Sequence, residues 1–180
     1  MILENWSKTL LISYRLLGLV VERIESMVQQ ISLNSMYYNR KTGCDTMSQI
    51  EKLIDYNDKK VNLTNLKVII EECIASLSQK ELEIVSLLYL DGLNVDEVAS
   101  TLGISVRTVF RRKKRALESF AKALSRKCSS EFLMDNYKDE LWLMDIYYSH
   151  ADGDNEEMDI ERKETVNIIF KAMKEIKATV

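Results

Sequence analysis

Proline is absent from all 180 residues of this chain, and no other feature restricts its fold as much. Proline fixes φ and cannot donate a backbone hydrogen bond, so it is frequent in rigid turns and rare inside helices. Four of the five glycines, Gly43, Gly92, Gly103 and Gly153, fall between segments of helical periodicity, where a residue that tolerates positive φ is useful. With a further break at Leu77–Ser78, the pattern predicts an all-α fold.

The first 77 residues carry two long helical patterns. Over residues 3–35, apolar side chains recur in alternating steps of four and three, the heptad spacing of a coiled-coil seam: Leu10, Tyr14, Leu17, Val21, Ile24, Val28 and Ile31. Over residues 46–77, the inner positions are expected to be Met47, Ile50, Ile54 and Val61, and after a phase shift Leu63, Leu66, Ile70, Cys73 and Leu77. We expect a long hairpin within the chain, although the seam also fits a coiled coil between chains.

Three helix starts follow in close succession. Ser78–Glu81 and Asn94–Glu97 have the spacing of capping boxes, and Ser105 precedes the helix of residues 106–124. Gly103 separates the second of these helices from the third. The apolar faces expected for the first two helices are Leu82, Val85 and Leu88, and Val98, Ala99 and Leu102.

The second and third of these helices have the spacing of a helix-turn-helix. Ala99 is small where two helices cross, Gly103 suits the turn, and Val109 can seat the second helix on the first. From Val106 to Lys127, nine Lys/Arg and one Glu give a local charge of +8 in a chain of net charge −3. A solvated helix face is the ordinary explanation of such a run, but here the turn projects it. The pattern therefore predicts binding to double-stranded DNA through phosphate contacts.

The segment "LSQKELEIVSLLYLDGLNVDEVASTLGISVRTVFRRKKRALESF", with its continuation to residue 124, resembles region 4 of bacterial sigma factors, the helix-turn-helix that reads the −35 promoter element. A longer stretch, residues 10–124, is similar to phage and prophage late-gene regulators of the ArpU type, which place a helical hairpin before such a helix-turn-helix. The resemblance implies a DNA-binding transcription regulator that acts at a promoter, with RNA polymerase as an expected partner.

The candidate contact residues lie on the helix of residues 106–124. Arg107, Thr108 and Arg111 are on the side away from Val109 and Ala116, so we expect them to read base edges. An arginine there can donate two hydrogen bonds to guanine. For the phosphates we expect Ser105 at the helix N-terminus, and Lys114 and Arg115 one turn further along. The resemblance implies that Arg112 faces inward.

The chain after residue 127 is acidic. Twelve Asp/Glu and three Lys/Arg between Glu131 and Glu164 give a charge of −9. Two amphipathic helices are expected, either as core or as a partner surface. The first carries Leu133, Tyr137, Leu141, Met144 and Tyr148, widened by Trp142 and Ile146, and the second carries Val166, Ile169, Phe170, Met173 and Ile176. A calcium loop is excluded because Glu157 and Lys163 stand where glycine and a bidentate glutamate are required.

We expect three segments: a hairpin over 1–77, a DNA-binding domain over 78–127 and an acidic helical tail over 128–180. No enzyme, cofactor or metal site is expected, because His150 is a lone histidine and the chain has neither a glycine-rich phosphate loop nor metal-ligand spacing. The odd cysteines Cys44, Cys73 and Cys128 suit a reducing cytoplasm, and neither a signal peptide nor a membrane span is expected.

Alternative functions stay open. The chain could be a stand-alone or split sigma subunit, although no segment like sigma region 2 is recognisable. It could be a DNA-packaging protein of the small-terminase kind, since those also join a helix-turn-helix to oligomerising helices. It could also be an interaction module that binds only protein. A homo-oligomer is possible in each case.

Overall fold

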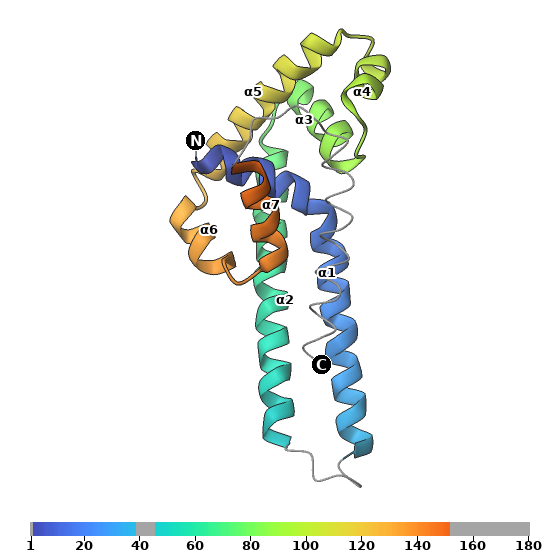
Figure 1. Cartoon of the computed structure of the whole chain (residues 1–180), viewed down its shortest axis with the longest axis vertical. Helices are drawn as coiled ribbons and strands as arrows, with labels where there is room; N and C mark the ends of the chain where they lie inside the picture. Colours follow the sequence, from blue (N-terminus) through green and yellow to red (C-terminus); the bar gives the residue numbers. More distant parts are fainter. Residues whose placement is uncertain (1, 39–45, 152–180) are drawn as a thin grey trace. The chain divides into compact units, whose positions relative to one another are not determined.

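A computed structural model describes residues 2–38 and 46–151. These residues form helices and no strand, so the predicted all-α fold is confirmed (Figure 1). The helices are α1 (Ile2–Tyr38), α2 (Thr46–Ala75), α3 (Gln79–Val85), α4 (Val95–Leu102), α5 (Val106–Leu124), α6 (Ser130–Tyr137) and α7 (Leu141–Ala151). A π-helical turn, Ser86–Leu90, extends α3.

The chain divides into two compact units. One holds residues 17–67, and the other joins residues 1–16 to the chain from residue 68 onward. The three functional segments expected from the sequence stay a prediction.

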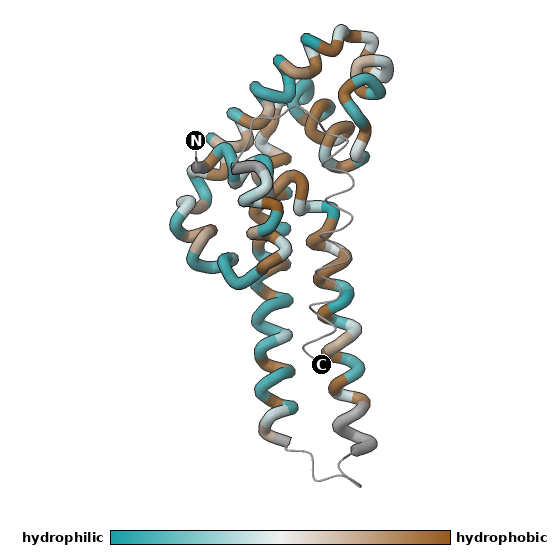
Figure 2. The backbone as a smooth tube through the Cα atoms, in the orientation of Figure 1, coloured by the Kyte–Doolittle hydropathy of each residue, from teal (hydrophilic) through white to brown (hydrophobic). Residues whose placement is uncertain are grey.

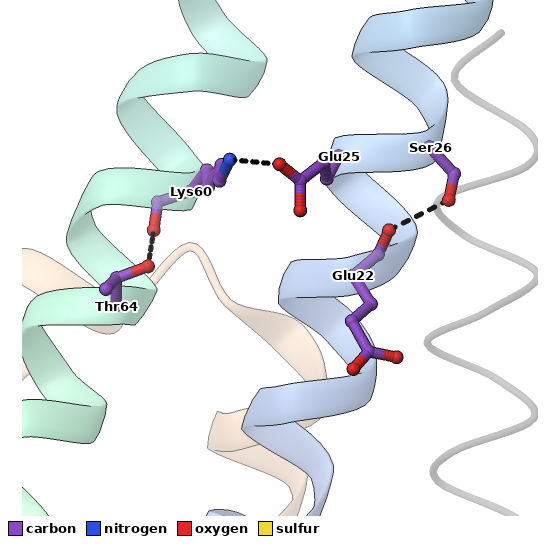
Figure 3. A network of polar contacts seen from close by, with 5 residues as sticks. All are labelled: Glu22, Glu25, Ser26, Lys60 and Thr64. Carbon is purple, nitrogen blue, oxygen red and sulfur yellow. Dashed lines mark hydrogen bonds and ion pairs between the residues drawn. The ribbon is translucent and has the colours of Figure 1, made fainter.

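In the unit of residues 17–67, α1 and α2 are tied by an ion pair. Lys60 Nζ of α2 lies 2.9 Å from Glu25 Oε1 of α1 (Figure 3). Both groups are substantially exposed, so the pair aligns the helices more than it stabilises them. Two hydroxyls bond within their own helices, Ser26 to the Glu22 carbonyl at 3.0 Å and Thr64 to the Lys60 carbonyl at 2.8 Å.

The predicted heptad seam of α1 is correct at some positions, and at others an adjacent residue is buried instead. Among the predicted residues, Leu10, Leu17 and Ile24 are buried, whereas Tyr14, Val21, Val28 and Ile31 are only half-buried. Val20 and Met27 take the other core positions. The displacement has a simple cause: α1 is apolar at both 20 and 21, and at both 27 and 28, so its sequence fits two adjacent stripes.

The predicted inner face of α2 is wrong in its first half. Met47, Ile50, Ile54 and Val61 are all exposed, by 46–62% of their surface. Figure 2 shows mostly hydrophilic residues along this part of α2. The later positions Leu63, Leu66, Ile70 and Cys73 are fully buried as predicted, while Leu77 is half-buried beyond the helix end.

The other unit packs the start of α1 against α7. The ring of Trp6, which is fully buried, lies 4.7 Å from the ring of Tyr147. The single amphipathic helix predicted over Leu133–Tyr148 is instead two helices, α6 and α7, because the chain turns between Lys138 and Glu140. Leu133, Tyr137, Trp142, Met144 and Ile146 are buried as core, but Leu141 and Tyr148 are each 57% exposed. The second predicted tail helix, with Val166 to Ile176, lies outside the described residues.

Candidate nucleic-acid interface

Helix α3 and its π-helical extension support the two helices, α4 and α5, that form the candidate interface. Val85 and Leu88 are buried as predicted, Leu82 is half-buried, and Ile84 and Tyr89 are buried in addition. Both Leu88 and Tyr89 belong to this extension. Gly92 then ends the element with φ +70°, a left-handed conformation that favours glycine.

The Glu81 carboxylate joins α3 to α5. Its Oε2 accepts from the Ser78 amide at 3.0 Å and the Ser78 hydroxyl at 2.6 Å, and its Oε1 accepts from the Ser119 hydroxyl of α5 at 2.6 Å. Partial burial raises the pKa of this carboxyl, but the bonds from Ser119 and Ser78, helped by the Arg115 charge, outweigh it and leave the pKa below its ordinary value. The carboxylate is therefore held ionised between the two helices.

Helix α4 begins at the predicted capping box. Asn94 Oδ1 accepts from the Glu97 amide at 2.8 Å, and Glu97 Oε2 accepts from the Asn94 amide at 2.7 Å. Val98 and Ala99 face inward and are buried, and Leu102 is half-buried.

The turn between α4 and α5 has the predicted glycine geometry. Gly103 has φ +61° and ψ +33°, and the Ile104 amide donates to the Ala99 carbonyl at 3.0 Å. This bond closes the end of α4 in the manner of a Schellman motif. Ser105 then caps α5 by accepting from the Thr108 amide at 3.3 Å. The predicted caps at Asn94 and Ser105 and the predicted turn at Gly103 are therefore all present.

Helix α5 is divided lengthwise into a buried and an exposed face. Val109, Ala116 and Phe120 are almost completely buried, and α5 packs on both α3 and α4. Five basic residues of α5 are exposed: Arg107, Arg111, Lys114, Arg115 and, in the last turn, Lys122. The helix thus presents a band of positive charge opposite its packing face.

The run of five basic residues from Arg111 to Arg115 does not act as one patch. Arg112 and Lys113 are half-buried, which agrees with the inward position expected for Arg112. Lys113 Nζ lies 5.9 Å from the centre of the Tyr89 ring, at the limit of a cation–π contact. Lys113 therefore lies close to the support of α5, whereas Arg111, Lys114 and Arg115 are exposed.

Two other predicted contact residues have hydroxyls engaged within the protein. The Ser105 and Thr108 side-chain oxygens lie 2.9 Å apart and share one hydrogen bond, in which either hydroxyl can donate. Thr108 is half-buried, in contrast to the exposed Arg107 and Arg111. The structure therefore brings the arginines together on one face and leaves Thr108 at its edge.

Sequence reasoning missed two apolar members of the exposed face. Val106 is 39% exposed and Phe110 is 45% exposed, both in the first turns of α5. The signal was present in the sequence, because Phe110 lies three residues after Arg107 and four before Lys114, on the side of the helix where contact residues were expected.

No group of three or more His, Cys, Asp or Glu residues in 2–38 and 46–151 is arranged to hold a metal ion. Cys73 and Cys128 are buried free thiols, and burial raises the pKa of both, to about 11 for Cys73. No helix in the described part of the chain has the length and apolarity to cross a membrane.

These features define the class: an all-α protein with a helix-turn-helix whose second helix presents a basic face. Residues 67–120 match the family described as Sigma-70, region 4, so the segment is a sigma region 4-like helix-turn-helix. The match spans the end of α2, all of α3 and α4, and most of α5. No curated protein and no solved structure is significantly similar to the chain.

Proposed function

We propose that the protein is a DNA-binding transcription regulator that reads promoter DNA with helix α5. The observation that carries the proposal is the exposed row of Arg107, Arg111, Lys114 and Arg115 on a helix whose opposite face is buried. Helix-turn-helix proteins place the start of this second helix in the major groove. The likeness of residues 67–120 to sigma region 4 supports the same function.

The side chains would divide the work by position. Arg107 and Arg111 lie in the first two turns, where a guanidinium can donate two hydrogen bonds to guanine. Lys114 and Arg115 lie one turn later and would hold phosphates. Ser105 would offer its amide to a phosphate at the helix N-terminus, since its hydroxyl already caps α5. Thr108 would read a base only from the edge of the contact face.

The first experiment selects a binding site from a random duplex library and then compares two variants on selected and random DNA. Arg111→Ala should weaken binding to the selected site by about 1–3 kcal/mol and relax one base position. Lys114→Ala should weaken binding to both DNAs alike and lower the salt slope by about one ion. Lys52→Ala, which removes an exposed charge from α2, should change neither. Equal losses for Arg111→Ala and Lys114→Ala on every sequence would contradict this division.

The finer role we propose is that of a phage or prophage late regulator of the ArpU type, with a contact to RNA polymerase. Its support is the order of a helical hairpin before a sigma region 4-like segment. Affinity purification from the native host should recover polymerase subunits. Recovery of a large packaging ATPase would favour the small-terminase alternative, and a lack of duplex binding at low salt would favour a protein-only module. A split sigma subunit would need a second protein to start transcription.

We also propose that two copies associate through α2. Met47, Ile54, Val61 and Val68 are spaced by seven and are all exposed, as one position of a heptad repeat would be, and Ile50 lies in the same stripe. Ile54→Ser should lower the mass in sedimentation equilibrium from dimer toward monomer, and Leu19→Ser, at an exposed site on α1, should not. A wild-type protein that is monomeric at all concentrations would refute this part of the proposal.

A further inference from the structure

Phe110 is exposed on the face of α5 that carries the arginines. Its side chain keeps 45% of its surface accessible, whereas the other phenylalanine of α5, Phe120, is fully buried. Val106, one turn before it, is 39% exposed. An aromatic ring left in water on the contact face of a helix-turn-helix is an apolar group available to a ligand.

The helix geometry puts this ring beside the guanidinium groups. At about 100° per residue, Phe110 lies roughly 60° around the helix from Arg107 and roughly 40° from Lys114. Its Cα is about 4.5 Å along the axis from that of Arg107, which compares with about 3.4 Å between base pairs. A base contacted by Phe110 would therefore be one or two base pairs from a guanine contacted by an arginine of the same helix.

Only one base presents an apolar group in the major groove, and that group is the 5-methyl of thymine. Phenylalanine has no donor or acceptor, so it cannot recognise the other base edges by hydrogen bonding. We propose that Phe110 is a specificity-determining residue that selects a thymine by contact with its 5-methyl group, within one or two base pairs of the guanine read by Arg107 or Arg111. This inference rests on the proposed DNA-binding function.

Replacement of thymine by deoxyuridine tests the contact, because it removes the methyl group and leaves base pairing intact. Each thymine of the selected duplex is replaced singly, and binding is measured by fluorescence anisotropy. One replacement should weaken binding by the wild-type protein roughly fourfold, which corresponds to the free energy of burying one carbon group. Phe110→Ala should weaken binding to the thymine duplex at least as much and should bind the thymine and deoxyuridine duplexes equally.

Two further variants separate contact from folding. Phe132→Ala removes a ring of equal exposure, 46%, from α6, and it should keep the full thymine preference. Phe110→Leu keeps an apolar side chain and should retain part of that preference. It replaces Phe110→Ala in the test if circular dichroism shows that Phe110→Ala does not fold. The inference is overturned if no thymine replacement affects the wild-type protein, or if Phe110→Ala or Phe110→Leu retains the full preference. In those cases sequence-specific binding would persist and the proposed function would stand; loss of all duplex binding by the wild type would refute both.

Discussion

At the scale of single residues, Gly103 sets the direction in which α5 leaves the turn. Its left-handed backbone lets the Ile104 amide close α4 while Ser105 begins α5 two residues later. An added Cβ at Gly103 would have no heavy atom within 4 Å, so the surroundings do not require glycine. The backbone angle alone requires it.

Gly103→Ala should therefore lower the free energy of unfolding by about 1 kcal/mol, because alanine resists the left-handed conformation. Gly103→Asn should lower it less, since asparagine adopts this conformation more readily. Gly18→Ala is the matched control: Gly18 also has open space around it but lies inside α1 without a positive φ, so alanine should stabilise there by about 0.5–1 kcal/mol. Urea denaturation measures all three. Equal effects of Ala and Asn at Gly103 would contradict the backbone explanation.

At the scale of secondary-structure elements, the contact between α3 and α5 includes one ionised group. The Glu81 carboxylate accepts hydrogen bonds from both helices, and its pKa is lowered in the folded protein. A lowered folded-state pKa means that the stabilisation is fully present above the ordinary pKa of 4.5 and is lost as pH falls through the folded-state value. Protonation therefore weakens the support of the basic helix.

Glu81→Gln should destabilise the protein by about 1 kcal/mol at pH 7, since it replaces charged hydrogen bonds with neutral ones at a partly exposed site. The difference from the wild type should shrink below pH 4.5 and vanish once both side chains are uncharged. Thermal melting by circular dichroism from pH 7 to pH 3 measures the difference. A difference that stays constant with pH would show that charge is not the cause.

Within the hairpin, Val21 and Ile24 are both predicted seam positions, but they differ in burial. Ile24 is fully buried, while Val21 is half-buried. Ile24→Ala should lower the free energy of unfolding by about 2–4 kcal/mol through the cavity it leaves. Val21→Ala should cost about 1 kcal/mol or less, because its side chain already contacts water. Chemical denaturation of the two variants gives the comparison, and a larger loss at Val21 would mean that Val21 is a core position, as the predicted seam requires.

Much of the site and less of the hairpin could be predicted from the sequence, and the reason lies in how local the signals are. The caps at Asn94 and Ser105 and the glycine at 103 act within four residues, so the sequence states them directly. The seam of α1 depends on which of two adjacent stripes meets α2, and the apolar pairs Val20–Val21 and Met27–Val28 allow either. The exposed stripe of α2 looked like a core because amphipathicity alone does not identify the partner that covers it.

At the scale of the whole molecule, the described part of the tail, α6 and α7, is part of the fold. Trp142, Leu143 and Ile146 of α7 are almost completely buried, and Tyr147 packs on Trp6 at the other end of the described chain. The acidic tail was expected to serve either as core or as a partner surface, and its described half, α6 and α7, buries core side chains. Removal of these helices would expose apolar surface of the unit that contains the helix-turn-helix.

Truncation after Ser129 should therefore shift the emission of Trp6 to longer wavelength and lower the melting temperature. Trp142→Phe in the full chain is the reference, because Trp6 is then the single tryptophan in both proteins. Truncation after Ala151, combined with Trp142→Phe, should leave the emission of Trp6 at its original wavelength, because Tyr147 is retained. An unchanged Trp6 spectrum after truncation at Ser129 would show that α7 does not cover this ring.

The contact between the rings of Trp6 and Tyr147 also sets an order of events during translation. The two rings are 141 positions apart, so at about 5–20 residues per second the second ring is made roughly 7–28 s after the first. Glu25 and Lys60 are only 35 positions apart, and their hairpin can close early in that interval. Until α7 leaves the ribosome, Trp6 is without its partner ring, and the nascent chain presents this tryptophan to any chaperone at the exit tunnel.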